Sequence, residues 1–175
     1  MIGRFEAEWP APARIRAFTT TRTGPGASAS PFDALNLGLR SGDDPLAAQA
    51  NRAALQAEIS TPLAPRWLHQ VHGIAVARFV GADEECGEPI ADAAVTDAPG
   101  LPLAILSADC LPVLFAAEDG EWSRLTLIGA DDPRIYGCPP GTQASSLSHA
   151  ENGPRTSGCG AGRVVSGCVH HQPGY

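Results

Sequence analysis

The spacing of apolar and polar residues predicts a mixed α/β domain in the first two-thirds of the chain. Apolar and polar positions alternate over residues 14–22, the period of a strand with one buried face. Residues 74–80, 101–106 and 111–117 form further short apolar runs of strand length. A glycine- and proline-rich turn at 24–26 interrupts the pattern, so the first strand is expected to end before it.

A helix is predicted to begin just after Asp44. This aspartate suits the N-cap position, and Pro45 suits the first helical turn, where its missing N–H is not needed. Apolar residues recur at Leu46, Ala50, Leu55 and Ile59, before Pro62 stops the helix. We therefore expect an α+β fold, a layered mixed β-sheet with flanking helices.

The character of the chain changes after about residue 118. From Gly129 to Tyr175 only five residues are Leu, Ile or Val, while Gly, Ser and Pro are abundant. Such a segment buries too little apolar surface to offset the entropy lost on ordering it. We therefore divide the chain into a folded domain at 1–118 and a tail at 119–175, which we expect to be irregular or disordered.

Charge and hydropathy exclude several classes of partner. The net charge of −7 argues against a nucleic-acid or anionic-membrane partner. No run reaches the roughly 18 apolar residues of a membrane span, and the first residues lack the apolar core of a signal peptide. The five scattered cysteines suggest no disulfide framework. We therefore expect a cytoplasmic protein.

Two residues are candidates for chemistry. His72 lies in the segment WLHQVHG, where a following glycine and a predicted strand favour an exposed ligand or base. Cys110 lies in a polar interruption between two apolar runs, where a thiolate can bind a metal or act as a nucleophile. Taken alone, His72 is better explained as a structural or surface histidine, and Cys110 as a small buried core residue.

Taken together, several segments resemble the laccase-domain proteins. They are TTTRTGPGAS (19–28), ALNLG (34–38), GDDP (42–45), NR (51–52), WLHQVHG (67–73), ADAAVTDAPG (91–100) and ADCLPVL (108–114). The resemblance covers roughly residues 15–118, and WLHQVHG and ADCLPVL are specific when they occur together. Members of this family carry the older description polyphenol or multicopper oxidase and are associated with purine nucleoside phosphorylase activity.

The resemblance implies a zinc site as the catalytic centre. Its ligands in the family are the His of QVHG, the Cys of ADC and a second His in a HAGWRG segment, and the first two fall on His72 and Cys110. Two His and one Cys leave the fourth tetrahedral position open for water or substrate, as in catalytic zinc sites. The resemblance also implies substrate-binding roles for Asn36, Arg52 and Gln70.

The implied reaction is phosphorolysis of adenosine or inosine to the free base and ribose 1-phosphate. Methylthioadenosine phosphorolysis and adenosine deamination are related activities, so the partners are a small nucleoside and phosphate. Two alternatives stay open. One is copper-dependent polyphenol oxidation, which needs more His-rich sites than the family motifs here supply. The other is an inactive truncated product with at most weak zinc binding.

The HAGWRG segment itself is absent from the chain. It is expected near residue 127, where the sequence from Leu125 to Asp131 reads LTLIGAD. If the coding DNA of this stretch is read one base earlier, its possible codons can encode His-Ala-x-(Trp or Arg)-Arg-Gly. We therefore expect a shift of reading frame between Leu114 and Leu125, which leaves a tail unrelated to the family and removes the third metal ligand. The remaining tail candidates match no zinc spacing: Cys138, Cys159, Cys168, His170 and His171.

Overall fold

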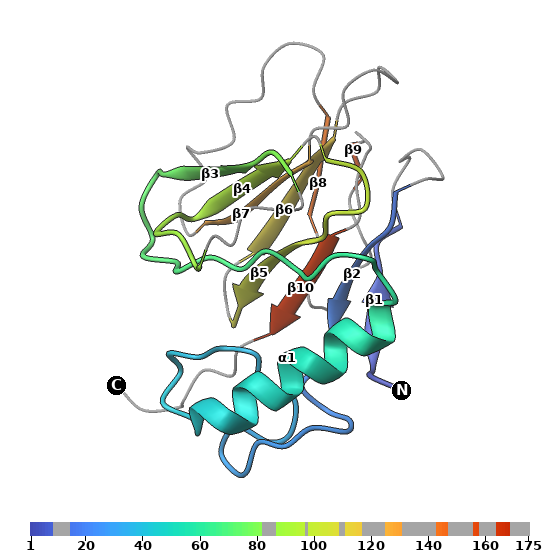
Figure 1. The fold of residues 1–175 in the computed structure, drawn as a ribbon. Helices are drawn as coiled ribbons and strands as arrows, with labels where there is room; N and C mark the ends of the chain where they lie inside the picture. The colour runs from blue at the N-terminus through green and yellow to red at the C-terminus, as the bar shows by residue number, and fades with distance from the viewer. Residues whose placement is uncertain are drawn as a thin grey trace.

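The computed structural model describes residues 1–8, 15–81, 87–96 and 98–108, together with the strands at 111–116, 125–130, 143–146, 156–157 and 164–168. This part of the chain contains one helix and ten strands. They form three layers: helix α1, a four-stranded sheet and a six-stranded sheet (Figure 1).

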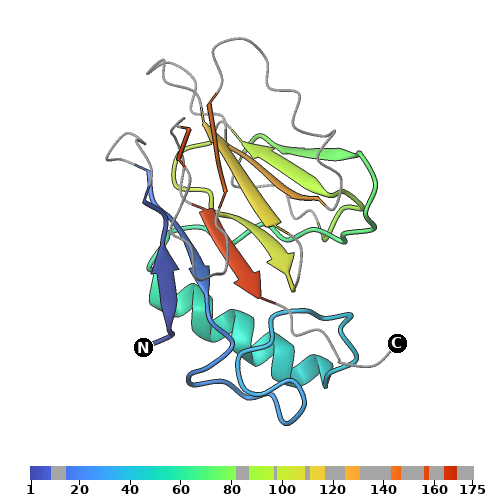
Figure 2. The same ribbon diagram turned by 180° about the vertical axis from the view of Figure 1, so that it is seen from behind.

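The four-stranded sheet lies in the middle of the three layers. Its strands are β1 (Arg4–Glu6), β2 (Ala17–Thr20), β5 (Leu103–Ser107) and β10 (Val164–Cys168), in the order β1-β2-β10-β5. Strand β1 is antiparallel to β2, whereas β10 runs parallel to both β2 and β5. The view from behind in Figure 2 shows β10, coloured red, between its two partners.

The six-stranded sheet has the order β3-β4-β7-β6-β8-β9. Its strands are β3 (Val76–Phe79), β4 (Ala93–Thr96), β6 (Leu111–Ala116), β7 (Leu125–Ala130), β8 (Gln143–Ser146) and β9 (Thr156–Ser157). Strands β3 and β4 are parallel, and the other neighbours are antiparallel. Both sheets are therefore mixed.

Alternation along β2 and β5 explains the layering. Successive side chains of a strand point to opposite faces of its sheet. Ala17 and Leu103 belong to the core between the two sheets, which also contains Phe79 and Leu114. Their sequence neighbours Phe18 and Ala104 lie in a second core on the other face, together with Leu35, Leu37 and Leu55.

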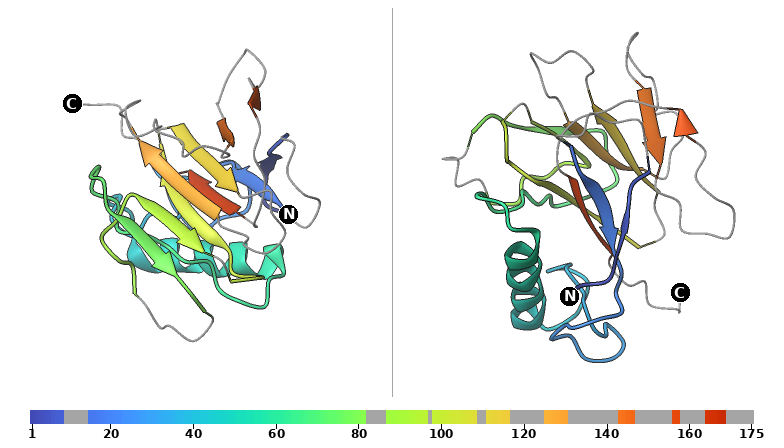
Figure 3. Two further views of the ribbon diagram at one scale, coloured as in Figure 1. Left: turned by 90° about the horizontal axis from the view of Figure 1, so that it is seen from above. Right: turned by 90° about the vertical axis from the view of Figure 1, so that its right-hand side faces the viewer.

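Helix α1 (Pro45–Ile59) covers that second face. It starts at Asp44, whose side chain accepts a hydrogen bond from the N–H of Leu46 at 2.9 Å. Leu55 is 1% exposed and packs into the second core, so α1 lies on the side of the four-stranded sheet away from the six-stranded one (Figure 3). The helix ends at Ser60, which adopts the left-handed conformation. No helix of the described residues is long and apolar enough to cross a membrane.

The local predictions for the first two-thirds of the chain are confirmed. The helix predicted after Asp44 is α1, and the strands predicted at 14–22, 74–80, 101–106 and 111–117 correspond to β2, β3, β5 and β6. The sequence predicted one mixed sheet with flanking helices, whereas the structure has two mixed sheets and one helix among the described residues. Strands β1 and β4 were not predicted, since each is short and lacks a clear alternation.

The C-terminal third differs from the expected irregular tail at four places. Strands β7, β8, β9 and β10 all pair with neighbours, and β10 matches β5 over five residues. Backbone ladders satisfy N–H and C=O groups even where the sequence offers little apolar surface. The other residues of 119–175 lie outside the described part of the chain, and the domain boundary at 118 stays a prediction.

Candidate functional site

His72 lies on a turn that is bound by a buried carboxylate. One oxygen of Asp92, Oδ1, accepts hydrogen bonds from the backbone N–H groups of Val71 at 2.8 Å and His72 at 2.7 Å. The other, Oδ2, accepts one from the N–H of Gly73 at 2.8 Å. Asp92 is 3% exposed, whereas His72 is exposed. Hydrogen bonds to an ionised acceptor are the stronger kind, so the turn has a firm anchor.

The anchor also explains the backbone conformation at His72. Its φ is 58°, in the left-handed region that side chains other than glycine's rarely adopt. That conformation costs about 1–2 kcal/mol, which the three bonds to Asp92 offset. The sequence analysis missed Asp92. Its signal is a charged residue directly before the apolar run that forms β4.

Gln70 attaches the same turn to β5. Its Oε1 accepts a hydrogen bond from the N–H of Leu106 at 2.7 Å, and its Nε2 donates to the Leu106 carbonyl at 3.0 Å. In sequence, Gln70 precedes His72 by two residues and Leu106 precedes Cys110 by four. The segment that carries one predicted ligand is therefore bonded to the strand that leads toward the other.

Cys110 itself lies outside the described residues. The predicted approach of His72 to Cys110 therefore stays a prediction, as does the zinc site. Within the described ranges no group of three His, Cys, Asp or Glu side chains could hold a metal ion. Of the tail candidates only Cys168 falls in a described segment, at the end of β10.

Asn36 organises the loop before α1. It is 1% exposed, and its Nδ2 donates to Ser41 Oγ at 2.8 Å and to Asp43 Oδ2 at 2.9 Å. Burial acts to raise the pKa of Asp43, but hydrogen bonds from Asn36, Ser28 and the backbone of Asp44 together hold this pKa below its ordinary value. The Asn36 amide is thus engaged within its own loop.

Arg52 joins α1 to three other segments. Its Nε donates to the Leu37 carbonyl at 2.7 Å, its Nη1 pairs with Glu88, and its guanidinium lies 4.0 Å from the centroid of the Trp67 ring. Among the residues that the structure describes, none forms a hydrogen bond with the buried Nη2 of Arg52. Burial is the main reason that the pKa of Arg52 is lowered, and the carboxylate of Glu88 opposes this only in part.

Glu88 accepts from two arginines at once. Arg40 pairs with its Oε2 and Arg52 with its Oε1. Burial acts to raise the pKa of Glu88, but the hydrogen bonds and charges of the two guanidinium groups outweigh it and lower this pKa. Glu88 lies two residues before Ile90, which forms a β-bridge with His69. This ion-pair cluster therefore borders the segment that leads to His72.

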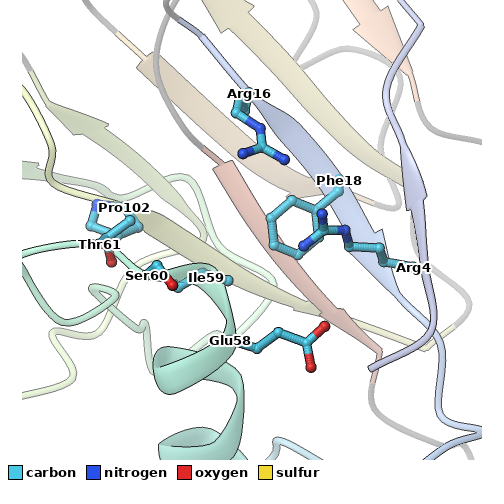
Figure 4. A pocket seen from close by; sticks show the side chains of 8 residues that line it. All are labelled: Arg4, Arg16, Phe18, Glu58, Ile59, Ser60, Thr61 and Pro102. Atoms are coloured by element: carbon cyan, nitrogen blue, oxygen red, sulfur yellow. The ribbon is translucent and has the colours of Figure 1, made fainter. Parts of the chain in front are cut away.

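A separate shallow pocket of about 160 Å³ lies between the N-terminal strands and the end of α1 (Figure 4). Its lining is Arg4, Arg16, Phe18, Glu58, Ile59, Ser60, Thr61 and Pro102. Arg4 lies 4.9 Å from the centroid of the Phe18 ring and pairs with Glu6 at 2.8 Å. None of the predicted site residues lines this pocket.

These features define a three-layer α/β protein in which a carboxylate-bound turn presents an exposed histidine. Residues 16–125 match the family described as multi-copper polyphenol oxidoreductase laccase, and the chain belongs to that family. The chain is 47% identical over 131 residues to a purine nucleoside phosphorylase of Xylella fastidiosa, covering 69% of this chain and 50% of that protein. A Pseudomonas aeruginosa purine nucleoside phosphorylase is 47% identical over 113 residues, covering 65% and 44%. The chain thus spans about half the length of the curated relatives it matches.

Two solved structures share the fold. A Neisseria meningitidis protein of family DUF152 has a TM-score of 0.67 and 26% identity, covering 96% of this chain and 88% of that chain. YlmD from Geobacillus stearothermophilus has a TM-score of 0.60 and 28% identity, covering 73% and 55%. The resemblance seen in the sequence motifs is confirmed, and the mixed α/β architecture is common to these proteins.

Proposed function

We propose that this chain carries the active-site region of a purine nucleoside phosphorylase that acts on adenosine or inosine. The observation that carries the proposal is the 47% identity to a relative of that name. The residues matched to the family, 16–125, include both His72 and Cys110. The structure supports the proposal by presenting His72 on an exposed turn with a fixed backbone.

In phosphorolysis the bond between the ribose C1′ and the purine N9 breaks, and a bond forms between C1′ and a phosphate oxygen. The electron pair of the broken bond leaves with the base, which takes up a proton, and ribose 1-phosphate is the second product. The protein must therefore position phosphate against C1′ and favour the departure of the base. Exclusion of water keeps hydrolysis from competing.

We also propose that His72 and Cys110 are zinc ligands. Zinc prefers imidazole nitrogen and thiolate donors, and these are the donor types that His72 and Cys110 would supply. A bound zinc ion with an open position would supply Lewis-acid polarisation of the substrate. The backbone N–H of His72 is bonded to Asp92, and the residue is exposed, which supports a ligand role on this turn.

We propose substrate contacts for Asn36, Arg52 and Gln70, but polar atoms of these side chains already form hydrogen bonds within the chain. Gln70 uses both polar atoms on Leu106, and Arg52 uses Nε and Nη1 on Leu37 and Glu88. In this conformation these side chains hold neighbouring backbone segments in place. Direct contact with substrate requires that these hydrogen bonds be exchanged.

The test is release of hypoxanthine from inosine, with and without phosphate, by a purified chain whose reading frame is restored between Leu114 and Leu125. The proposal expects release that depends on phosphate, yields ribose 1-phosphate in equal amount and disappears in His72→Ala. Turnover that is independent of phosphate, or that survives in His72→Ala, contradicts it. Phenol-dependent oxygen uptake with added copper would instead favour polyphenol oxidation, and ammonia release from adenosine would favour deamination.

A further inference from the structure

The carboxylate of Asp92 has a set of partners that points to a role beyond burial. Three consecutive N–H groups, those of Val71, His72 and Gly73, converge on it at 2.7–2.8 Å. Successive N–H groups of this kind form a concave anion-binding turn. Here the anion is supplied by the chain itself, from the residue directly before β4.

We propose that Asp92 is a positioning residue for His72, holding the turn in the one backbone conformation that presents the imidazole to a ligand. This inference rests on the proposed function, in which His72 binds the zinc ion. Asp92 touches neither metal nor substrate in this scheme. It acts through the backbone of residues 71–73.

The elements around Asp92 make it a rigid support. The next two residues, Ala93 and Ala94, are 4% and 0% exposed and belong to β4, a strand paired on both sides. On the other side of the turn, Gln70 is bonded to β5. The His72 turn is therefore fixed from both sheets, and a side chain on a fixed backbone binds a ligand with little loss of entropy.

A merely structural role predicts something different. If Asp92 only satisfies buried N–H groups, its loss lowers the stability of the fold and leaves the intrinsic metal affinity of His72 unchanged. A positioning role predicts a loss of affinity in protein that is still folded. Partners that orient a metal ligand typically contribute about 10–100-fold in affinity.

The test compares the full chain with Asp92→Asn, which has the same size but only one oxygen to accept hydrogen bonds. We expect the amide proton resonances of Val71, His72 and Gly73 to move upfield, as charge-assisted hydrogen bonds are lost. Zinc affinity, measured by competition with a chromogenic chelator, should fall about 10–100-fold. Should Asp92→Asn not fold, Asp92→Glu keeps the charge while displacing it, and its affinity should fall by a smaller factor.

Thr96→Val is the matched control on the same strand. The Thr96 hydroxyl is buried, donates to the Phe79 carbonyl at 2.8 Å and accepts from the N–H of Ala98 at 3.0 Å. The variant should lower stability but leave the amides of residues 71–73 and the zinc affinity unchanged.

Three results decide the matter. Unchanged zinc affinity in folded Asp92→Asn overturns the positioning role, and so do unchanged amide resonances at 71–73. Equal zinc binding by the wild-type chain and His72→Ala overturns the proposed metal site instead. In that last case the amide resonances alone decide whether Asp92 fixes the turn.

Discussion

Gln70 pairs with the backbone of Leu106 as a neighbouring strand would. Its amide oxygen accepts from the Leu106 N–H at 2.7 Å, and its amide nitrogen donates to the Leu106 carbonyl at 3.0 Å. A side-chain amide has the same donor and acceptor as a peptide group. The Gln70 amide therefore satisfies the Leu106 backbone at the edge of β5 in the way that a paired strand would. The segment before His72 is fixed to the sheet by it.

Replacement of Gln70 by leucine should therefore destabilise the fold. Gln70→Leu leaves the part-buried N–H and C=O of Leu106 without these partners, at about 1–3 kcal/mol for each group. We expect the free energy of unfolding in urea to fall by about 2–4 kcal/mol. Gln56→Leu, the same exchange at an exposed position of α1, is the control and should change it by less than about 0.5 kcal/mol. Equal effects in both variants would contradict this role of Gln70.

Asn51 is a buried amide on α1 that should be equally sensitive. Its Oδ1 accepts from the N–H of Ala27 at 2.7 Å, and its Nδ2 donates to Ser28 Oγ at 2.9 Å and to the Asn36 carbonyl at 2.8 Å. Asn51→Leu should lower the free energy of unfolding by about 3 kcal/mol.

Asn51→Asp separates the acceptor role of the Asn51 side chain from its donor role. It keeps the acceptor for Ala27 but loses the donors, so hydrogen exchange at the Ala27 amide should stay slow in Asn51→Asp and become fast in Asn51→Leu. The same exchange rate in both variants would show that Asn51 does not protect Ala27.

These residues show where the sequence was informative and where it was not. The caps of α1 and the alternation in β2 and β5 are local patterns, so their elements were predicted. His72 was found through its motif. Asp92 was not found, because it lies about twenty residues from the turn in sequence. A single aspartate in a sequence does not indicate which distant residues it will bind. For the same reason the sequence did not reveal that Gln70 bonds to Leu106, and the substrate role of Gln70 stays a prediction.

The Glu88 ion-pair cluster should make stability depend on pH. The pKa of Glu88 is lowered below its ordinary value of 4.5 in the folded chain. Its ionised form therefore contributes stability that is complete above about pH 4.5 and is lost as the pH falls through the lowered pKa. The stability difference between the wild-type chain and Glu88→Gln, about 1–3 kcal/mol at neutral pH, should shrink below that range. Urea unfolding between pH 7 and pH 3 measures it, and a difference that grows toward low pH would contradict the lowered pKa.

The end of α1 offers a stabilising substitution. Ser60 has φ 52° and ψ 43°, the left-handed conformation that glycine adopts without a Cβ penalty. Ser60→Gly should raise the free energy of unfolding by about 0.5–1 kcal/mol, since relief of the penalty exceeds the extra entropy of the unfolded chain. Ala57→Gly, inside the same helix and exposed, is the control and should lower it by about 1 kcal/mol. A loss of stability in Ser60→Gly would contradict the argument.

The last prediction concerns activity, and it separates this chain from the family it belongs to. The third ligand implied by the family is a histidine expected near residue 127, within β7, where the chain has Leu127. Loss of a residue that merely orients a ligand costs about 10–100-fold, so loss of a ligand should cost more. We therefore expect little or no phosphorolysis of inosine by the chain as it stands. A chain whose reading frame is restored between Leu114 and Leu125 should bind about one zinc ion more tightly than the present chain, as a three-ligand site requires, and should release hypoxanthine in the presence of phosphate. Comparable turnover by both chains would mean that a tail residue such as His149 or His170 replaces the missing ligand. Alanine substitution of each would then identify it.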